Sequence, residues 1–240
     1  MQTVIHKEKS FAIAYDGNVM DAPGAEYFNV DFWRSRQALT GEAPGRGSAW
    51  FIDSPSGAVV LRQFLRGGWV AGLSRQSYFF TTVERSRPFR EYHLLAALFG
   101  KGLPVPRPVA ALCEHHGITS TGAIMTARIA SAQTLADVLP GNNGGEVPVE
   151  GLWARIGSCI RRFHDAGVWH ADLNARNILL DGGQQVFLID FDRARFTPGK
   201  AVSGQGNLNR LKRSLVKLWP TEQLPALQPA WIQLEVGYHG

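Results

Sequence analysis

Two short apolar runs late in the chain constrain its fold more than any other feature. Ile178–Leu180 and Val186–Ile189 contain branched residues, and the segment Asp181-Gly-Gly-Gln between them is typical of a tight turn. The pattern predicts a β-hairpin, whose open ends lie side by side. Asn177 precedes the first strand and Asp190 follows the second, so their oxygen atoms can meet at one hard cation such as Mg²⁺.

A second motif lies directly before this hairpin. His170-Ala-Asp172-Leu-Asn-Ala-Arg-Asn177 matches the H-x-D-x-x-x-x-N pattern of the protein-kinase catalytic loop, and Asp190-Phe-Asp192 stands where kinases carry the metal-binding D-F-G. The match assigns Asp172 to accepting the proton of a substrate hydroxyl, and Asn177 and Asp190 to binding a metal. Any one of these residues alone is typical of a solvated hairpin end, but all of them in this order favour a kinase.

The composition is that of a globular protein. The 240 residues, 45% of them hydrophobic and 19% charged, suffice for one large domain or two small lobes and exclude a disordered chain. No apolar run approaches the ~20 residues of a membrane span, and the N-terminus does not resemble a signal peptide, so we expect a cytoplasmic location. Cys113 and Cys159 fit a reducing compartment as buried thiols.

The net charge of +5 indicates an anionic partner. Charge alone does not distinguish a nucleotide, a nucleic acid, a phosphorylated substrate and an acidic membrane surface. No nucleic-acid-binding motif is present, so we expect no nucleic-acid partner, and nothing in the sequence points to a protein partner.

The first half of the chain contains candidate strands and a candidate phosphate-binding turn. Gly45-Arg-Gly47 can bring backbone amides close to phosphates, although Trp50 stands where the third glycine of a kinase glycine-rich loop would be. A turn at Ser54-Pro-Ser-Gly57 separates two apolar runs, which predicts a hairpin covering a nucleotide. The sequence predicts strands at residues 11–15, 50–52, 58–62, 109–113 and 118–129.

Arg62 is the candidate ligand of the α- and β-phosphates of a nucleotide. Val59-Val-Leu-Arg62 matches the kinase V-A-I-K motif with arginine in place of lysine, and no lysine lies between Lys9 and Lys101. Glu91, near the start of a helix predicted over residues 89–99, is its candidate partner. A glutamate favoured there by the helix dipole is an equally good explanation.

Two groups in this half allow more than one interpretation. The aromatic residues 27, 28, 32 and 33 lie beside Arg34 and Arg36, which suits either packing on the following lobe or an amphipathic contact with a membrane. Residues 62–90 carry six arginines and one acid, Glu84, which favours an anion-binding insertion over an ordinary solvated face.

The second half is predicted to be mostly helical. We expect a short helix from Gln133 to Leu139, a strong helix from Leu152 to Ala166, and a basic amphipathic helix from Asn209 to Leu218. Its leucines favour a core contact, with a lipid-facing helix as the alternative. The predicted fold class is α+β: a protein-kinase-like bilobal fold with a small β-rich N-lobe (1–127) holding one long helix, and a small, mostly helical C-lobe (128–240).

Over residues 45–218 the chain resembles the 3-deoxy-D-manno-octulosonic acid (Kdo) kinases of lipopolysaccharide core assembly, relatives of the heptose kinases. The catalytic stretch alone indicates only a protein-kinase-like enzyme, and the Arg-Gly-Gly, Pro-Val-Pro-Arg-Pro and Asp-Phe-Asp segments narrow the resemblance. The stretches that carry it are Gly45-Arg-Gly-Ser-Ala-Trp-Phe, Val60-Leu-Arg with Arg66-Gly-Gly68, Phe89-Arg-Glu91, Leu103-Pro-Val-Pro-Arg-Pro108, Phe163-His-Asp-Ala-Gly-Val168, His170-Ala-Asp-Leu-Asn174 and Leu188-Ile-Asp-Phe-Asp192.

The resemblance implies ATP-dependent phosphorylation of a Kdo hydroxyl, the 4-hydroxyl in this family, on a Kdo-bearing lipid A precursor. It also implies a peripheral location at the cytoplasmic face of the inner membrane, whose anionic surface would be a second partner. ATP is then the phosphoryl donor and Mg²⁺ the expected metal. The alternatives are a heptose kinase or another small-molecule kinase, and a nucleotide-binding pseudokinase scaffold, which the replacement of lysine by Arg62 would suit.

Overall fold

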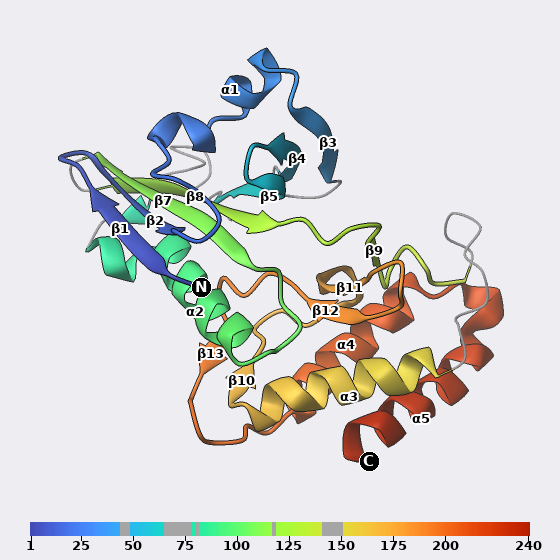
Figure 1. Ribbon diagram of the computed structural model, residues 1–240. Coiled ribbons are helices and arrows are strands. Elements are labelled where there is room, and N and C mark those ends of the chain that lie inside the picture. Colours follow the sequence, from blue (N-terminus) through green and yellow to red (C-terminus); the bar gives the residue numbers. More distant parts are fainter. Residues whose placement is uncertain (44–48, 65–77, 80–81, 117–118, 141–150) are drawn as a thin grey trace. The chain divides into compact units, whose positions relative to one another are not determined.

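The computed structural model describes residues 1–43, 49–64, 78–79, 82–116, 119–140 and 151–240. The fold is mixed, with a large antiparallel sheet and several helices (Figure 1). The chain divides into two compact units, and each is considered by itself below. The first unit comprises Met1–Gly100 and Pro106–Arg128, and the second comprises Lys101–Val105 and Ile129–Gly240.

The first unit is built on one antiparallel sheet with the strand order β1-β2-β7-β8-β5-β4-β3, and β6 pairs with β8. A turn at Pro55 and Ser56 connects β4 and β5, as the sequence predicts, and β7 and β8 pair as antiparallel neighbours. The strands are β1 (Thr3–Lys7), β2 (Phe11–Asp16), β3 (Leu39–Ala43), β4 (Ala49–Ser54), β5 (Gly57–Gln63), β6 (Tyr78–Phe79), β7 (Pro108–His116) and β8 (Thr119–Ala127).

Successive residues of a strand point to opposite faces of the sheet, so this sheet contacts two different layers. The helix α2 (Arg87–Gly100) covers one face, where a side chain at Gly122 would meet Pro88. The 3-10 helix η1 (Ala25–Phe28) and the short helix α1 (Val30–Ser35) lie on the other side (Figure 1). A further 3-10 turn, η3 (Val83–Arg85), precedes α2.

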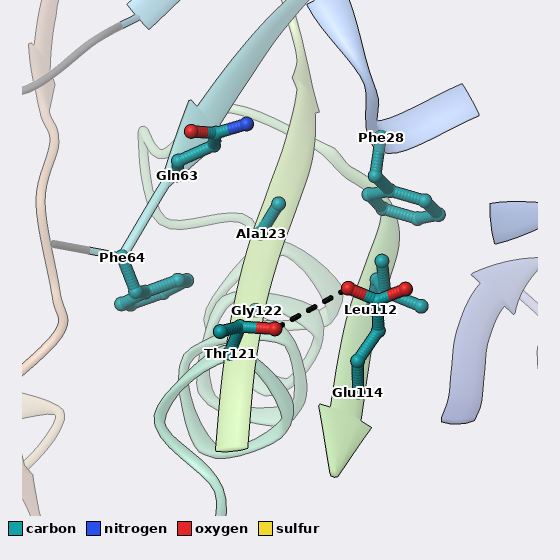
Figure 2. Close-up of a pocket in the computed structure, with 8 residues that line it drawn as sticks. All are labelled: Phe28, Gln63, Phe64, Leu112, Glu114, Thr121, Gly122 and Ala123. Carbon is teal, nitrogen blue, oxygen red and sulfur yellow. Dashed lines mark hydrogen bonds between the residues drawn. The ribbon is translucent and has the colours of Figure 1, made fainter. Parts of the chain in front are cut away.

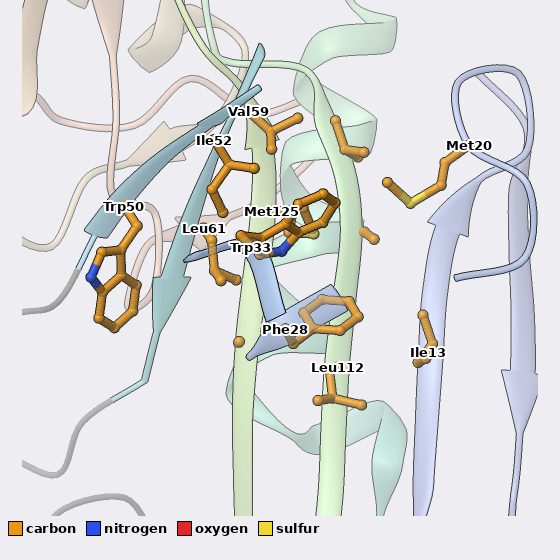
Figure 3. Packing of buried hydrophobic residues seen from close by; sticks show 13 residues of the cluster. Ile13, Met20, Phe28, Trp33, Trp50, Ile52, Val59, Leu61, Leu112 and Met125 are labelled. Atoms are coloured by element: carbon orange, nitrogen blue, oxygen red, sulfur yellow. The ribbon is translucent and has the colours of Figure 1, made fainter. Parts of the chain in front are cut away.

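The aromatic residues before the first predicted hairpin belong to the core of this unit. Phe28 and Trp33 are buried and pack over Leu61, Leu112 and Met125 of the sheet (Figure 3). The indole nitrogen of Trp33 donates a hydrogen bond to the carbonyl of Tyr27, so its polar group is satisfied inside the core. Packing, and not a membrane-facing foot, therefore explains these rings.

The N-terminal segment contributes more to the sheet than its weak alternation predicts. The strand predicted at residues 11–15 is confirmed as β2, and β1, which the sequence did not predict, pairs with it along its whole length. Asp16, at the end of β2, is fully buried, and both of its carboxylate oxygens accept hydrogen bonds. They come from the backbone of Gln2 and Asn18 and from the guanidinium of Arg107, at 2.6–3.1 Å.

The second unit contains two small sheets and three helices within its described residues. The strands β9 (Gln133–Thr134), β11 (Ile178–Leu180) and β12 (Val186–Leu188) form one sheet, and β10 (Val168–Trp169) pairs with β13 (Arg195–Phe196) in the other. The helices are α3 (Leu152–Asp165), α4 (Gln205–Leu218) and α5 (Leu224–His239), with 3-10 turns η4 (Ala175–Asn177) and η5 (Thr221–Gln223).

The helices α3 and α5 approach each other closely because glycines stand at their crossing. A Cβ atom on Gly157 would lie 2.0 Å from the carbonyl oxygen of Leu234, and one on Gly237 would lie 2.0 Å from that of Ala154. Each glycine thus makes room for the backbone of the other helix. The contact buries Ile160, Leu234 and Tyr238.

The predicted hairpin at residues 178–189 is confirmed, and so are the helices predicted over 89–99, 152–166 and 209–218, each within a few residues. The short helix predicted from Gln133 is wrong. Gln133 and Thr134 form strand β9, and the side chains of Thr134 and Asp137 then hydrogen-bond each other's backbone amides, which stabilises a turn instead.

Both cysteines are free and buried, as predicted, and burial raises the pKa of the Cys159 thiol to about 12. Among the described residues, no helix combines the length and the apolar character that crossing a membrane requires. The glycine turn at Gly45 and Gly47, and residues 65–77 and 80–81 of the arginine-rich stretch 62–90, lie outside the described residues.

Candidate active site

In the first unit the structure brings Arg62 and Glu91 together, as the sequence predicts. Arg62 lies on β5, on the face that α2 covers, and Glu91 lies in the second turn of α2. The Nη2 atom of Arg62 lies 2.5 Å from each carboxylate oxygen of Glu91. The Glu91 side chain is 3% exposed and that of Arg62 is 27% exposed, so the carboxylate is enclosed while the guanidinium reaches solvent.

The guanidinium of Arg62 also lies over an aromatic ring. Its central carbon is 4.8 Å from the centroid of the Phe64 ring, which Arg87 approaches at 5.2 Å. A cation above an aromatic face is attracted by the ring quadrupole, and the contact restricts the arginine further. Arg62 is therefore held by a carboxylate and a ring, with its guanidinium partly exposed to solvent.

In the second unit, buried hydrogen bonds shape the predicted catalytic loop. The Nδ1 atom of His170 accepts a hydrogen bond from the backbone amide of Asp172, and its Nε2 atom donates to the carbonyl of Ile189. This arrangement requires the neutral imidazole, and burial lowers the pKa of His170, which favours the same form. The ring also packs edge-on against Phe191. His170 thus joins the loop to the end of the hairpin.

A second buried network holds the loop from the side of the helices. Asn207 of α4, which is fully buried, accepts a hydrogen bond from the His170 amide at 3.1 Å and donates one to the His170 carbonyl at 2.5 Å. Its side-chain oxygen also accepts from Nε2 of His164 at 3.0 Å, and Nδ1 of His164 accepts from the hydroxyl of Tyr238 at 2.8 Å. Burial lowers the pKa of His164. The chain of bonds joins α5, α3 and α4 to the loop.

Asp172 is presented to solvent and contacts an arginine that the sequence did not single out. Arg210 of α4 donates a hydrogen bond from Nη1 to Oδ1 of Asp172 at 3.1 Å. Both side chains are about half exposed. One turn further along α4, the Ser214 hydroxyl accepts a hydrogen bond from the Ala175 amide. One stripe of α4 thus lies along the loop. It consists of Asn207, Arg210 and Ser214, which are three and four residues apart.

Asn177 and Asp190 are brought to the same end of the hairpin, as predicted. The Asn177 carbonyl accepts a hydrogen bond from the Ile189 amide, next to Asp190. The Asn177 side-chain nitrogen donates to the carbonyl of Asp172 at 2.9 Å, which leaves its oxygen as the atom able to bind a cation. Asp190 has φ 65°, in the left-handed region that aspartate tolerates better than most residues.

The donor set at this end is one amide oxygen and one carboxylate. Among the described residues there is no group of three or more His, Cys, Asp or Glu side chains suited to a metal ion. Mg²⁺ is commonly bound by one or two protein oxygens and completed by substrate phosphates and water, so Asn177 and Asp190 fit such an ion. Their assignment as metal ligands remains a prediction.

An open hollow of about 330 Å³ lies elsewhere, on the sheet of the first unit. Figure 2 shows it between Phe28, Gln63, Phe64, Leu112 and the strand residues of β8, with a hydrogen bond from the Thr121 hydroxyl to Glu114. Arg62 and Glu91 are not among its lining residues.

The structure thus describes two sets of candidate residues, each within its own unit: Arg62 with Glu91 in the first, and Asp172, Asn177 and Asp190 in the second. Sequence reasoning missed Asn207 and Arg210. Asn207 is a polar residue next to the leucine stripe of an amphipathic helix, a position that often marks a buried hydrogen-bonding role. Arg210 gave no comparable signal, because basic residues on that helix were expected to be solvated.

Comparison with known proteins gives the class of enzyme. The sequence model of the lipopolysaccharide kinase (Kdo/WaaP) family matches residues 30–238. The chain belongs to this family. A 3-deoxy-D-manno-octulosonic acid kinase of Stenotrophomonas maltophilia (strain R551-3) is 41% identical over 228 residues, which cover 95% of this chain and 89% of the relative.

Two further relatives with the same name are similar. The relative from Xanthomonas euvesicatoria pv. vesicatoria (strain 85-10) is 41% identical, and the match covers 86% of this chain and 81% of the relative. The relative from Xylella fastidiosa (strain M12) is 38% identical, and the match covers 95% of this chain and 89% of the relative. Membership of the family makes the chain a phosphotransferase that acts on an alcohol group.

Proposed function

We propose that the protein transfers a phosphoryl group from ATP to a Kdo hydroxyl, the 4-hydroxyl, on a Kdo-bearing lipid A precursor. The names of its relatives support Kdo as the substrate, since each is called a 3-deoxy-D-manno-octulosonic acid kinase. The observation that carries the proposal within this chain is the loop that presents the exposed carboxylate of Asp172 while His170 and Asn207 fix its backbone.

The reaction needs a positioned base and little other covalent chemistry from the protein. Asp172 accepts a hydrogen bond from the sugar hydroxyl and takes its proton as the hydroxyl oxygen forms a bond to the γ-phosphorus. The bond between that phosphorus and the bridging oxygen of ADP breaks, ADP leaves, and the proton passes to solvent. Holding the hydroxyl and the phosphoryl group in line supplies most of the rate enhancement.

The phosphates of ATP are assigned to groups in both halves of the sequence. Arg62, kept in place by Glu91, binds the α- and β-phosphates. Asn177 and Asp190 would hold Mg²⁺, which would neutralise part of the phosphate charge. We further propose a protein-kinase-like arrangement of a β-rich N-lobe (1–127) and a mostly helical C-lobe (128–240), which the strand-rich first unit and helix-rich second unit support.

The acceptor is a lipid, so we also propose a peripheral location at the cytoplasmic face of the inner membrane. The helix α4 carries Lys212, Arg213 and Lys217 besides Arg210 and contains no acidic residue. On α5, Ile232 and Val236 are 50% and 64% exposed. Cations and exposed apolar side chains together suit an anionic lipid surface. Co-sedimentation with anionic but not neutral vesicles is expected, and equal binding to both would contradict the proposal.

The deciding experiment is transfer of labelled γ-phosphate from ATP in the presence of Mg²⁺, with four acceptors compared side by side. They are a Kdo-lipid A precursor, the same precursor lacking the 4-hydroxyl, a heptose-bearing core acceptor whose Kdo lacks the 4-hydroxyl, and no acceptor. Label on the first acceptor alone is the expected result. Label on the precursor that lacks the 4-hydroxyl would overturn the position, and label only on the heptose-bearing acceptor would overturn the substrate. Absence of label from all of them would contradict phosphoryl transfer to these sugars.

A further inference from the structure

The contact between Asp172 and Arg210 raises a question about the acceptor, on the assumption that the proposed function is correct. The carboxylate that has to receive a substrate hydroxyl already accepts a hydrogen bond from a guanidinium, with Nη1 of Arg210 at 3.1 Å from Oδ1. Within the part of the chain that the structure describes, this is the only ion pair of Arg210. We propose that Arg210 binds the carboxylate of the acceptor sugar acid and so selects an acidic acceptor.

The first support is the geometry of the guanidinium. Arginine has five N–H donors in a planar fork that matches a carboxylate, and one of them suffices for the observed contact with Oδ1. The remaining donors can bind a second carboxylate while Nη1 stays with Asp172. Both side chains are about half exposed, at 45% and 59%, so a substrate can reach this arginine without any change in the core.

The second support is proximity. A base that takes the proton of a hydroxyl must lie within hydrogen-bond distance of it, so the acceptor sugar has to lie against Asp172. Arg210 touches the same carboxylate and therefore lies beside the acceptor. A sugar acid carries its carboxylate a few bonds from its ring hydroxyls, which places the acid group within reach of this arginine.

The third support is charge balance. Bringing an acidic sugar to Asp172 places two carboxylates close together, and like charges at such a distance repel each other. A guanidinium that contacts both removes this repulsion, whereas a neutral sugar needs no such compensation. Arg210 is thus a specificity-determining residue, and its contribution to acceptor binding depends on the charge of the acceptor.

Helix α4 places this arginine accurately. Asn207, one turn earlier on α4, is hydrogen-bonded to the backbone of His170, and Ser214, one turn later, accepts from the Ala175 amide. The same helix therefore fixes the loop on both sides of Asp172. The other basic residues of α4 have no contact with the loop among the described hydrogen bonds and ion pairs, and Lys212 lies instead over the Trp231 ring.

The test combines two variants with two acceptors. Arg210→Met removes the cation while keeping a long side chain, and Arg34→Met makes the same change at an exposed arginine of the first unit that also pairs with an aspartate, Asp31. Each enzyme is assayed with the Kdo acceptor and with the same acceptor whose Kdo carboxylates have been reduced to alcohols. The KM and kcat for the acceptor and the KM for ATP are measured separately, and thermal unfolding checks that both variants are folded.

We expect Arg210→Met to lower kcat/KM for the acidic acceptor by roughly 10- to 100-fold, mainly through KM, as for loss of one charge-assisted hydrogen bond. On the reduced acceptor its effect should be under about threefold, and Arg34→Met should change kcat/KM for either acceptor by no more than about twofold. The KM for ATP should not change.

An equal loss on both acceptors would overturn the inference, because Arg210 would then only orient Asp172. Failure of the wild-type enzyme to label either acceptor is a different outcome, which would refute the proposed function and the inference with it. Arg210→Lys sharpens the result. This variant keeps the positive charge but not the planar, forked set of guanidinium donors. It should recover part of the lost affinity for the acidic acceptor only.

Discussion

The two arginine–carboxylate pairs of the candidate site lie in opposite environments. Glu91 is 3% exposed and meets one nitrogen of Arg62 through both of its oxygens, whereas Asp172 is 59% exposed and meets Arg210 through one oxygen. A buried carboxylate cannot leave its partner without a large desolvation cost, while an exposed one exchanges partners with little loss. The first pair therefore fixes the position of an arginine, and the second leaves a carboxylate available to a substrate.

The largest expected effect comes from the exposed pair. Asp172→Asn should lower kcat for phosphoryl transfer by at least about 10³-fold, since it removes the proposed base, while nucleotide affinity should change little. Asp165→Asn is the matched control, because Asp165 is also an exposed carboxylate paired with an arginine, Arg161. Transfer assays and nucleotide titration measure the two effects. Normal turnover by the Asp172 variant would refute the assignment of Asp172 as the base. The exposed pair would then have no functional role to set against the buried pair.

Breaking the buried pair should affect both stability and nucleotide binding. Arg62→Met leaves the Glu91 carboxylate enclosed without this guanidinium, so we expect a loss of about 2–3 kcal/mol in the free energy of unfolding. The KM for ATP should rise by roughly 10-fold or more. Urea unfolding and ATP kinetics measure these changes.

Two further variants make that prediction specific. Arg62→Lys should recover most of the stability, because an ammonium still meets the buried carboxylate. Arg34→Met removes an exposed arginine that pairs with Asp31 and should cost less than about 1 kcal/mol. If Arg62→Met were no more destabilising than Arg34→Met, the contrast between a fixed and an exchangeable pair would fail.

An exposed aspartate needs support from its backbone, and Asn207 supplies it. Asn207→Ala removes the partner of the His170 amide, the His170 carbonyl and the His164 ring, and should cost about 2–3 kcal/mol in the free energy of unfolding. Turnover should fall as well, because the loop that carries Asp172 loses its anchor. Asn209→Ala, at an exposed position of the same helix, should change stability by less than about 0.5 kcal/mol. Equal effects of both variants would show that the network is dispensable.

The smallest effect on activity is expected at a buried pair with no proposed role in the reaction. Burial alone would raise the pKa of Asp16, but hydrogen bonds from the Gln2 and Asn18 amides and from Arg107 outweigh it, so its pKa is lowered. A carboxyl group with a lowered pKa contributes stability above its unfolded pKa of about 3.9, and this is lost as the pH falls through the folded value. The stability gap between wild type and Asp16→Asn should therefore narrow below about pH 4 in urea unfolding. A gap that does not depend on pH would contradict this assignment.

The sequence predicts those parts of the site whose partners are close along the chain or follow a known motif. The hairpin at residues 178–188 has a strong turn signal between two apolar runs, so Asn177 and Asp190 are correctly brought to one end. Arg62 and Glu91 are 29 residues apart, and only the kinase pattern, not local propensity, links them. The partners of Asp172 and His170 on α4 are 38 and 37 residues away, respectively, and no local pattern encodes such a contact.

The elements that sequence reasoning missed lack the usual periodicity. The helix α5 contains Pro225 and Pro229, and its solvent side carries Ile232 and Val236, so no polar face alternates with its buried one. Pro225 lies in the first turn, where proline is tolerated because amides there have no internal partner, whereas Pro229 lies inside the helix. The strand β1 is polar and largely exposed, and it is defined only by its pairing with β2. In both cases tertiary contacts determine the structure.

The network that ends at Tyr238 has a consequence for the order in which the enzyme becomes active during synthesis. The hydroxyl group that donates a hydrogen bond to His164 belongs to Tyr238, which lies 74 residues further along the chain, in the last helix. Synthesis proceeds at about 5–20 residues per second, so the catalytic loop emerges seconds before the helix that completes its support. The loop can form early, but its geometry is fixed only when α5 docks against α3. Activity is therefore expected to be the last property that a folding chain acquires, and a sensitive report of α5 docking.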